Sequence, residues 1–90
     1  MAAIWKFQLA VVGRQVLMVP EGPVPLCVQV QRGQPCLWLR VDPSKSAQPY
    51  TVLVVGTGHE REDIADALYV GSFQLHDGDF VGHVFVERAK

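Results

Sequence analysis

Turn-forming residues recur about every ten positions in this chain of 90 residues, and that spacing limits the fold more than any other feature. The turn signals are Gly13, Pro20-Glu21-Gly22-Pro23, Arg32-Gly33, Asp42-Pro43-Ser44, Gly56-Thr57-Gly58 and Asp77-Gly78. Short runs rich in Val, Leu, Phe and Trp separate them, which is typical of an all-β sandwich or barrel. We predict a single β-rich domain over residues 1–90, a small antiparallel sandwich or barrel of about seven short strands with one short helix. The strands are expected near residues 4–10, 14–19, 24–31, 35–41, 49–56, 69–75 and 80–87.

The first clear hairpin is predicted over residues 25–41, around a two-residue turn at Arg32-Gly33. One face then carries apolar cross-strand pairs, Val28 with Leu37 and Leu26 with Leu39. The opposite face carries Cys27 beside Trp38, Gln29 beside Cys36, and Arg40. The two cysteines become diagonal neighbours at roughly 7–8 Å, too far apart for an unstrained disulfide. We therefore expect two free thiols.

A second hairpin is predicted around Asp77-Gly78, a dipeptide favoured where both turn positions need a positive φ. Its predicted cross-strand pairs are Leu75 with Phe80, Phe73 with Gly82, Ser72 with His83, and Val70 with Phe85. His83 therefore lies in mid-strand. Between the two hairpins, residues 51–55 form the continuous apolar run TVLVV, which predicts a central strand covered on both faces.

A short helix is predicted after this strand, from about Gly58 to Ala67. Thr57 and Glu60 have the spacing of a capping box at its start. Its first turns carry three carboxylates that suit the helix dipole, Glu60, Glu62 and Asp63. We expect this helix to bury Ile64 and Leu68.

The charge balance excludes several functional classes. Eight Lys and Arg against nine Asp and Glu give a net charge of −1 with no run of like charges, so no basic field for non-specific nucleic-acid binding is present. No window approaches the ~20 apolar residues of a membrane span, and the first residues do not form a secretory signal. We expect a cytoplasmic protein that binds neither membrane nor nucleic acid.

The loop Gly56-Thr57-Gly58-His59 is one candidate site, because a glycine-rich loop entering a helix presents backbone N–H groups to a phosphate. His83 is the residue most able to join it as a ligand-binding group. The loop lacks the P-loop lysine and the full dinucleotide fingerprint, and carboxylates crowd the helix start. We interpret it as a turn with a capping box, and keep an anion or nucleotide site as the alternative.

No catalytic or metal-binding arrangement is evident. The three histidines lack the HExxH or HxH spacing that places two imidazoles side by side, and no serine lies in a nucleophile elbow. The cysteines lie on a strand face without an adjacent base to lower their pKa. We therefore expect no enzyme, no cofactor and no metal, with His83 a partly buried structural residue.

The face that carries Trp38, Arg40 and Gln29 is the second candidate, because Trp and Arg dominate protein interaction hot spots. Either a partner binds there, or a second sheet or a second copy of the chain covers Trp38. Small domains often gain burial by self-association, so we expect a homo-oligomer.

Five stretches of the chain carry a family resemblance: Ile4-Trp5-Lys6-Phe7, QVQRGQPCLWLRVDP at residues 29–43, VVGTGH at 54–59, YVGSFQL at 69–75 and GHVFVE at 82–87. In these stretches the chain resembles a family of short uncharacterised proteins of bacteriophages and prophages. The resemblance implies a phage or prophage product acting inside an infected bacterium. We expect a non-enzymatic binding module for a host protein or a small ligand, with counteraction of a bacterial defence as one role of such a module. The alternatives are a virion or assembly component and, third, an enzyme or nucleotide-signal binder using residues 56–59 and His83.

Overall fold

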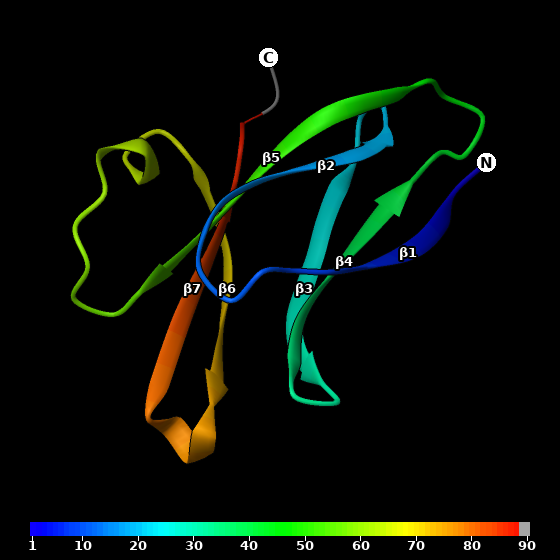
Figure 1. The fold of residues 1–90 in the computed structure, drawn as a ribbon. Coiled ribbons are helices and arrows are strands. Elements are labelled where there is room, and N and C mark those ends of the chain that lie inside the picture. Colours follow the sequence, from blue (N-terminus) through cyan, green and yellow to red (C-terminus); the bar gives the residue numbers. More distant parts are fainter. Residues whose placement is uncertain (89–90) are drawn as a thin grey trace.

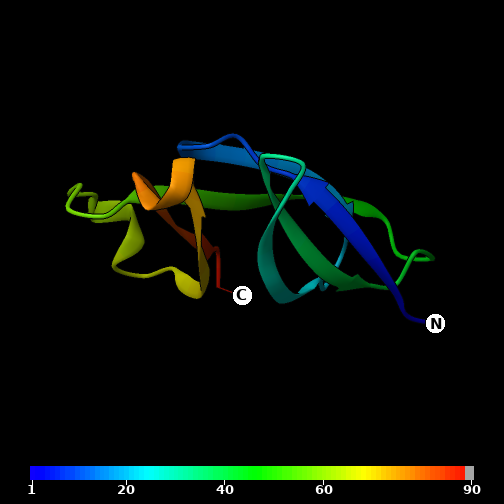
Figure 2. The same cartoon turned by 90° about the horizontal axis from the view of Figure 1, so that it is seen from below.

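The computed structural model describes residues 1–88, which form seven strands in two antiparallel sheets (Figure 1). The strands are β1 (Ala3–Gln8), β2 (Gly13–Pro20), β3 (Val24–Gln31), β4 (Gln34–Val41), β5 (Ala47–Gly56), β6 (Leu68–Leu75) and β7 (Phe80–Val86). One sheet has the order β1-β4-β3 and the other β2-β5-β7-β6. The sheets pack face to face as a sandwich, not as a closed barrel (Figure 2). The mainly β prediction is confirmed.

The core lies between the two sheets and follows the alternation of each strand. Every second residue of a strand points inward, and seven inward residues of β4, β5 and β7 are at most 2% exposed: Leu37, Leu39, Val41, Val52, Val54, Val84 and Val86. On the other side of β5, Leu53 and Val55 are also buried, each 4% exposed. The apolar run in β5 is therefore covered on both faces, as predicted.

The hairpin formed by β3 and β4 has the predicted two-residue turn, with φ of 53° at Arg32 and 77° at Gly33. Val28 lies opposite Leu37 as expected, but the predicted pair of Leu26 with Leu39 is wrong. A β-bulge at Leu26 shifts the register, so that Pro25 lies opposite Leu39 and the Leu26 side chain is 43% exposed.

The hairpin formed by β6 and β7 repeats this arrangement. Its register is the predicted one from Leu75 opposite Phe80 to Ser72 opposite His83. A bulge at Val70 then shifts the pairing, and Tyr69, not Val70, lies opposite Phe85. In both hairpins the extra residue lies in the first strand, at the end far from the turn. A bulge leaves one residue without a cross-strand partner, and no local sequence signal marks it here.

The predicted helix over residues 58–67 is wrong. Only a 3-10 turn forms there, η1 (Glu62–Ile64), without a side-chain N-cap. Thr57 does not cap a helix, because its hydroxyl is hydrogen-bonded to His83 Nε2 at 2.7 Å. Its N–H donates to Val81 O at 3.1 Å and extends the ladder between β5 and β7. Ile64 is only half-buried and Leu68 is 40% exposed, too little apolar contact to hold a short helix. No helix in residues 1–88 is long and apolar enough to cross a bilayer.

Candidate functional site

The predicted loop site is only partly assembled by the fold. Gly56 ends β5, and Thr57 Oγ1 shares a hydrogen bond of 2.7 Å with Nε2 of His83 in the neighbouring strand β7. The His83 ring also lies 6.3 Å from the ring of Tyr69, which in turn contacts Phe85 edge-on at 5.3 Å. The Thr57 hydroxyl and the Tyr69 ring therefore flank His83 on the outer side of the four-stranded sheet.

His59 does not join this cluster. A Cβ placed on Gly56 would lie 3.0 Å from the His59 ring and 3.2 Å from the Phe80 ring. Gly56 is in phase with the inward residues of β5, so the His59 ring lies on the core side of that strand, whereas His83 lies on the outer side. The two imidazoles therefore lie on opposite sides of the sheet, and within residues 1–88 no group of three His, Cys, Asp or Glu could hold a metal ion.

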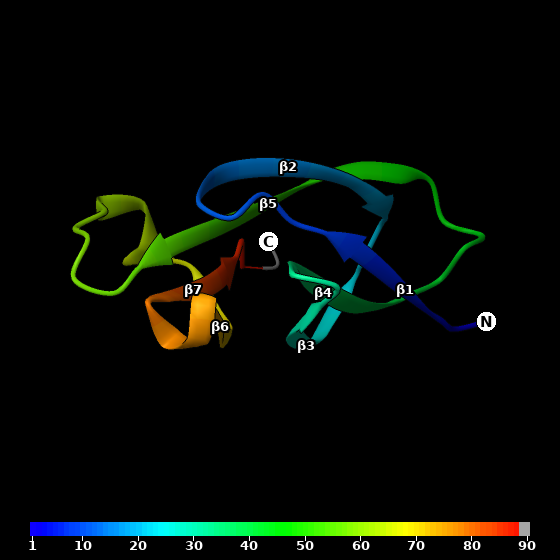
Figure 3. The same cartoon turned by 60° about the horizontal axis from the view of Figure 1, so that its bottom comes forward.

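The second candidate is the outer face of the β1-β4-β3 sheet, which we call the basic face. The strand pairings place on it Ile4, Lys6, Gln8, Val24, Cys27, Gln29, Gln31, Gln34, Cys36, Trp38 and Arg40. Gln29 and Arg40 are exposed and Trp38 is half-buried. In the part of the chain described, the other sheet packs on the opposite, inward side, and no segment crosses this one (Figure 3).

β1 brings residues to this face that were not predicted for it. Lys6 lies opposite Trp38, and its Nζ donates to Gln31 Oε1 on the far strand. This bond crosses β4 at the level of Cys36, which is only 3% exposed. Lys6 therefore covers a thiol and keeps its charge beside Trp38. The alternation Ile4-x-Lys6-x-Gln8 could have indicated one outward face, but only the pairing of β1 with β4 shows where it lies.

The two cysteines have the predicted relation. Cys27 lies opposite Trp38 and Cys36 opposite Gln29, so the thiols are diagonal neighbours. Both are free, and Cys36 Sγ donates to Gln34 O at 3.6 Å.

A family model, described as a domain of unknown function (DUF7352), matches residues 1–90. The chain belongs to this family. No curated protein matches it. No solved structure matches it either.

In this DUF7352 domain the charges are unevenly distributed. The basic face carries Lys6 and Arg40, with Arg32 at the adjoining turn, and none of its outward positions is Asp or Glu. Seven of the nine carboxylates lie between Glu60 and Glu87, outside the β1-β4-β3 sheet. A net charge of −1 therefore conceals one positive face with an aromatic residue at its centre.

Proposed function

We propose that this chain is a non-enzymatic binding module whose basic face docks on an acidic protein surface. The observation that carries the proposal is that Trp38 lies on an uncovered sheet face between Lys6 and Arg40, with no carboxylate among the outward residues. Trp and Arg are the residue types most enriched at interaction hot spots. A positive field steers an acidic partner and rejects basic ones.

The resemblance to phage and prophage proteins indicates where to look for the partner. We take it to be a bacterial host protein in the cytoplasm, and interference with a host defence would fit such binding. The half-buried position of Trp38 supports a hot-spot role, because its rotamer is already restricted and little side-chain entropy is lost on docking.

The test is affinity capture of a bacterial lysate with the tagged chain, followed by measurement of binding to each captured protein in purified form. We expect Trp38→Ala to weaken binding about 30-fold, the loss of a hot spot of about 2 kcal/mol. Arg40→Glu should weaken binding and flatten its salt dependence, since a rim charge acts mainly through long-range attraction. The matched control is Arg14→Glu, the same charge change on exposed Arg14 of β2, which should leave binding unchanged.

Three results would contradict the proposal. One is a partner whose affinity is unchanged by Trp38→Ala in a variant that melts like the wild type. Another is capture that disappears on nuclease treatment, which would make nucleic acid the ligand. The third is a chain that captures nothing and is found in purified phage particles, which would favour the virion or assembly role.

A further inference from the structure

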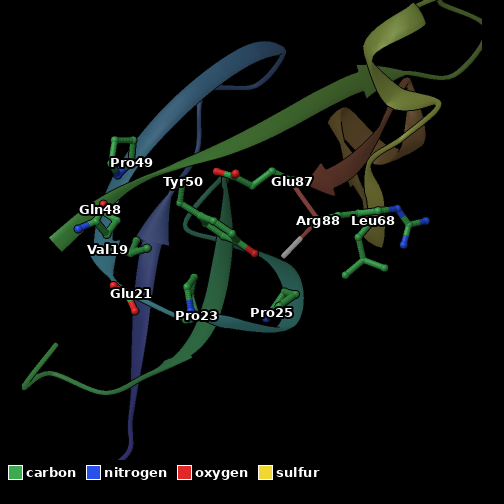
Figure 4. A pocket seen from close by; sticks show the side chains of 11 residues that line it. Val19, Glu21, Pro23, Pro25, Gln48, Pro49, Tyr50, Leu68, Glu87 and Arg88 are labelled. Atoms are coloured by element: carbon green, nitrogen blue, oxygen red, sulfur yellow. The ribbon is translucent and has the colours of Figure 1, made fainter. Parts of the chain in front are cut away.

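A pocket of about 310 Å³ lies between the two sheets, at the end where β3 and β6 begin and β7 ends (Figure 4). Its walls are mostly apolar and include three prolines: Val19, Pro23, Pro25, Pro49, Tyr50 and Leu68. It lies on the inward side, so it is separate from the basic face. Its volume is at the lower end of the range of small-molecule sites.

The two β-bulges account for the opening. Near its middle, β3 approaches β6 closely, since a Cβ placed on Gly71 would lie 3.9 Å from the Val28 Cβ. The bulges at Leu26 and Val70 follow on the side away from the turns, and just beyond them Pro25 and Leu68 line the pocket. Because a bulge bends and twists its strand, two facing bulges separate the strand ends and leave the space open.

Tyr50 is the polar group at the base of the pocket. It is only 7% exposed, and its ring lies among the pocket walls with the hydroxyl directed into the open space (Figure 4). Within residues 1–88 no group forms a hydrogen bond with that hydroxyl. Burial, and then the charge of Glu87, raise the pKa of Tyr50 to about 12, so the phenol stays protonated at neutral pH. No buried side-chain oxygen in the described residues lacks a partner, so the Tyr50 hydroxyl reaches the open space of the pocket, where a ligand can replace water as its partner.

The charge nearest the hydroxyl is negative. Glu87 Oε1 accepts a hydrogen bond from the Thr51 N–H at 2.7 Å, which anchors the carboxylate above Tyr50 and leaves its second oxygen without a bond in the described chain. Glu21 adds a second carboxylate to the lining. The neighbouring cation, Arg88, donates from Nε to Asp66 O at 3.1 Å, and its guanidinium extends away from Tyr50 (Figure 4).

We propose that this pocket binds a small arylalkylamine, a flat aromatic ring that carries a protonated amine on a short side chain. The flat ring fits between the proline rings, Leu68 and Tyr50, because aromatic and proline surfaces bury flat apolar groups with little loss of rotamer freedom. The ammonium group takes the free oxygen of Glu87, and the Tyr50 hydroxyl supplies a second polar contact. A charged hydrogen bond to a partly enclosed carboxylate is stronger than a neutral one and selects cations over anions.

Three indoles that differ only in the charge of the side chain test the site: tryptamine, tryptophol and indole-3-acetate. Binding is followed by NMR titration of backbone amides in the full chain. We expect tryptamine to shift the amides of Val19, Tyr50 and Leu68, with affinity about 10-fold above tryptophol, the value of one charged contact, and weakest binding for indole-3-acetate.

Two variants separate the contributions. Glu87→Gln keeps an oxygen for the Thr51 N–H and removes the charge, so it should abolish the preference for tryptamine over tryptophol. Tyr50→Phe should weaken both ligands about 3-fold to 10-fold, the loss of one hydrogen bond. The matched control, Tyr69→Phe on the outer side of β6, should change neither affinity.

Several outcomes would overturn the proposal: no shift with any of the three indoles, indole-3-acetate binding as well as tryptamine, or shifts confined to the basic face. Trp38→Ala should leave tryptamine binding intact, since Trp38 lies on the other side of its sheet. The pocket and the proposed protein-binding face can therefore fail or succeed independently.

Discussion

The two hairpins of this domain have the same pattern of strand pairing but reverse the chain through different turns. The β3–β4 hairpin reverses in two residues, whereas the β6–β7 hairpin uses four, His76–Asp79, with positive φ at His76, Asp77 and Gly78. Each runs in regular register away from its turn and then carries one bulge in its first strand. In both hairpins, a residue just beyond the bulge lines the pocket, Pro25 in β3 and Leu68 in β6. Both turns supply the left-handed backbone that a tight reversal needs.

The hairpins also differ in how their inward positions are filled. In β4 the inward residues are full-sized, and Leu37 and Leu39 are completely buried. In β7 the corresponding row contains Gly82, and the ring of Phe73 occupies the space above it: a Cβ there would lie 2.6 Å from Phe73 Cε1. In the β3–β4 hairpin, a substitution at the turn glycine is therefore opposed by backbone conformation. In the β6–β7 hairpin, a substitution at Gly82 is opposed by lack of space.

The largest expected effect is a side chain placed at Gly82. Gly82→Val should lower the free energy of unfolding by about 3 kcal/mol, because the branched side chain must displace the Phe73 ring in a packed core. Urea denaturation measures this loss. Gly71→Ala is the matched control in the same hairpin and should be close to neutral, since its Cβ would meet only ordinary contact distances.

A double-mutant cycle sharpens this result. Phe73→Ala removes the ring, so in that background Gly82→Val should cost much less, with a coupling of about 1–2 kcal/mol. If the two substitutions are additive, the clash with Phe73 is not the cause of the loss.

The next expected effect concerns the bulges. Deletion of Leu26 leaves the pairs of Pro25 with Leu39 and Cys27 with Trp38 in register, so the fold should survive at a cost of about 1–2 kcal/mol. Tryptamine binding should be lost, because a regular strand no longer bends away at the pocket. Deletion of Val70 is the matched change in β6. Intact binding in both deletion variants would show that the bulges do not form the pocket.

The register of each hairpin could be predicted from its turn because a hairpin is a local structure. The bulges could not, because Leu26 and Val70 are apolar residues that fit a regular strand equally well. The bulges arise where two edge strands from different sheets meet, a contact that no short window contains. The helix prediction failed for a related reason, since Thr57 is recruited into the sheet by Val81, which is distant in sequence.

The residues of the candidate sites also divide into those placed by local strand alternation and those placed by contacts distant in sequence. Placing Trp38 and Arg40 on one face needed only strand alternation, which is local and was correct. The presence of Lys6 on that face depends on the pairing of the first strand with β4, a non-local contact that alternation does not specify. The pocket around Tyr50 depends on the ends of several strands, and Tyr50 alone resembles an ordinary core residue.

A smaller effect is expected at the turn of the β3–β4 hairpin. Gly33 has a φ of 77°, and nothing lies within 4 Å of a Cβ placed there, so Gly33→Ala tests backbone strain alone. We expect a loss of about 1 kcal/mol in thermal or urea unfolding. Gly33→Asn should cost less, because asparagine tolerates the left-handed region. Equal losses for the two variants would indicate that strain at this position is not the cause.

The smallest effect on stability at neutral pH is expected at Tyr50, in the pocket beside the two bulges. Tyr50→Phe removes a hydroxyl without a hydrogen bond in the described chain, so it should change the free energy of unfolding by less than about 1 kcal/mol. At alkaline pH the free energies of unfolding of the wild type and of Tyr50→Phe should diverge. The pKa of Tyr50 rises from 10.0 to about 12 in the folded chain, so the unfolded chain loses this proton first. Below pH 10 the wild type therefore keeps all of the folding free energy that depends on the protonated phenol. As the pH rises toward 12, its free energy of unfolding falls by about 1–2 kcal/mol. The Tyr50→Phe variant lacks this loss. Urea denaturation in a Tyr69→Phe background measures it, while tyrosinate absorbance then reports Tyr50 alone. Parallel stability curves for the two variants across this range would mean that the phenol is as well solvated in the pocket as in the unfolded chain, and the pocket would then be too open to hold a ligand through it.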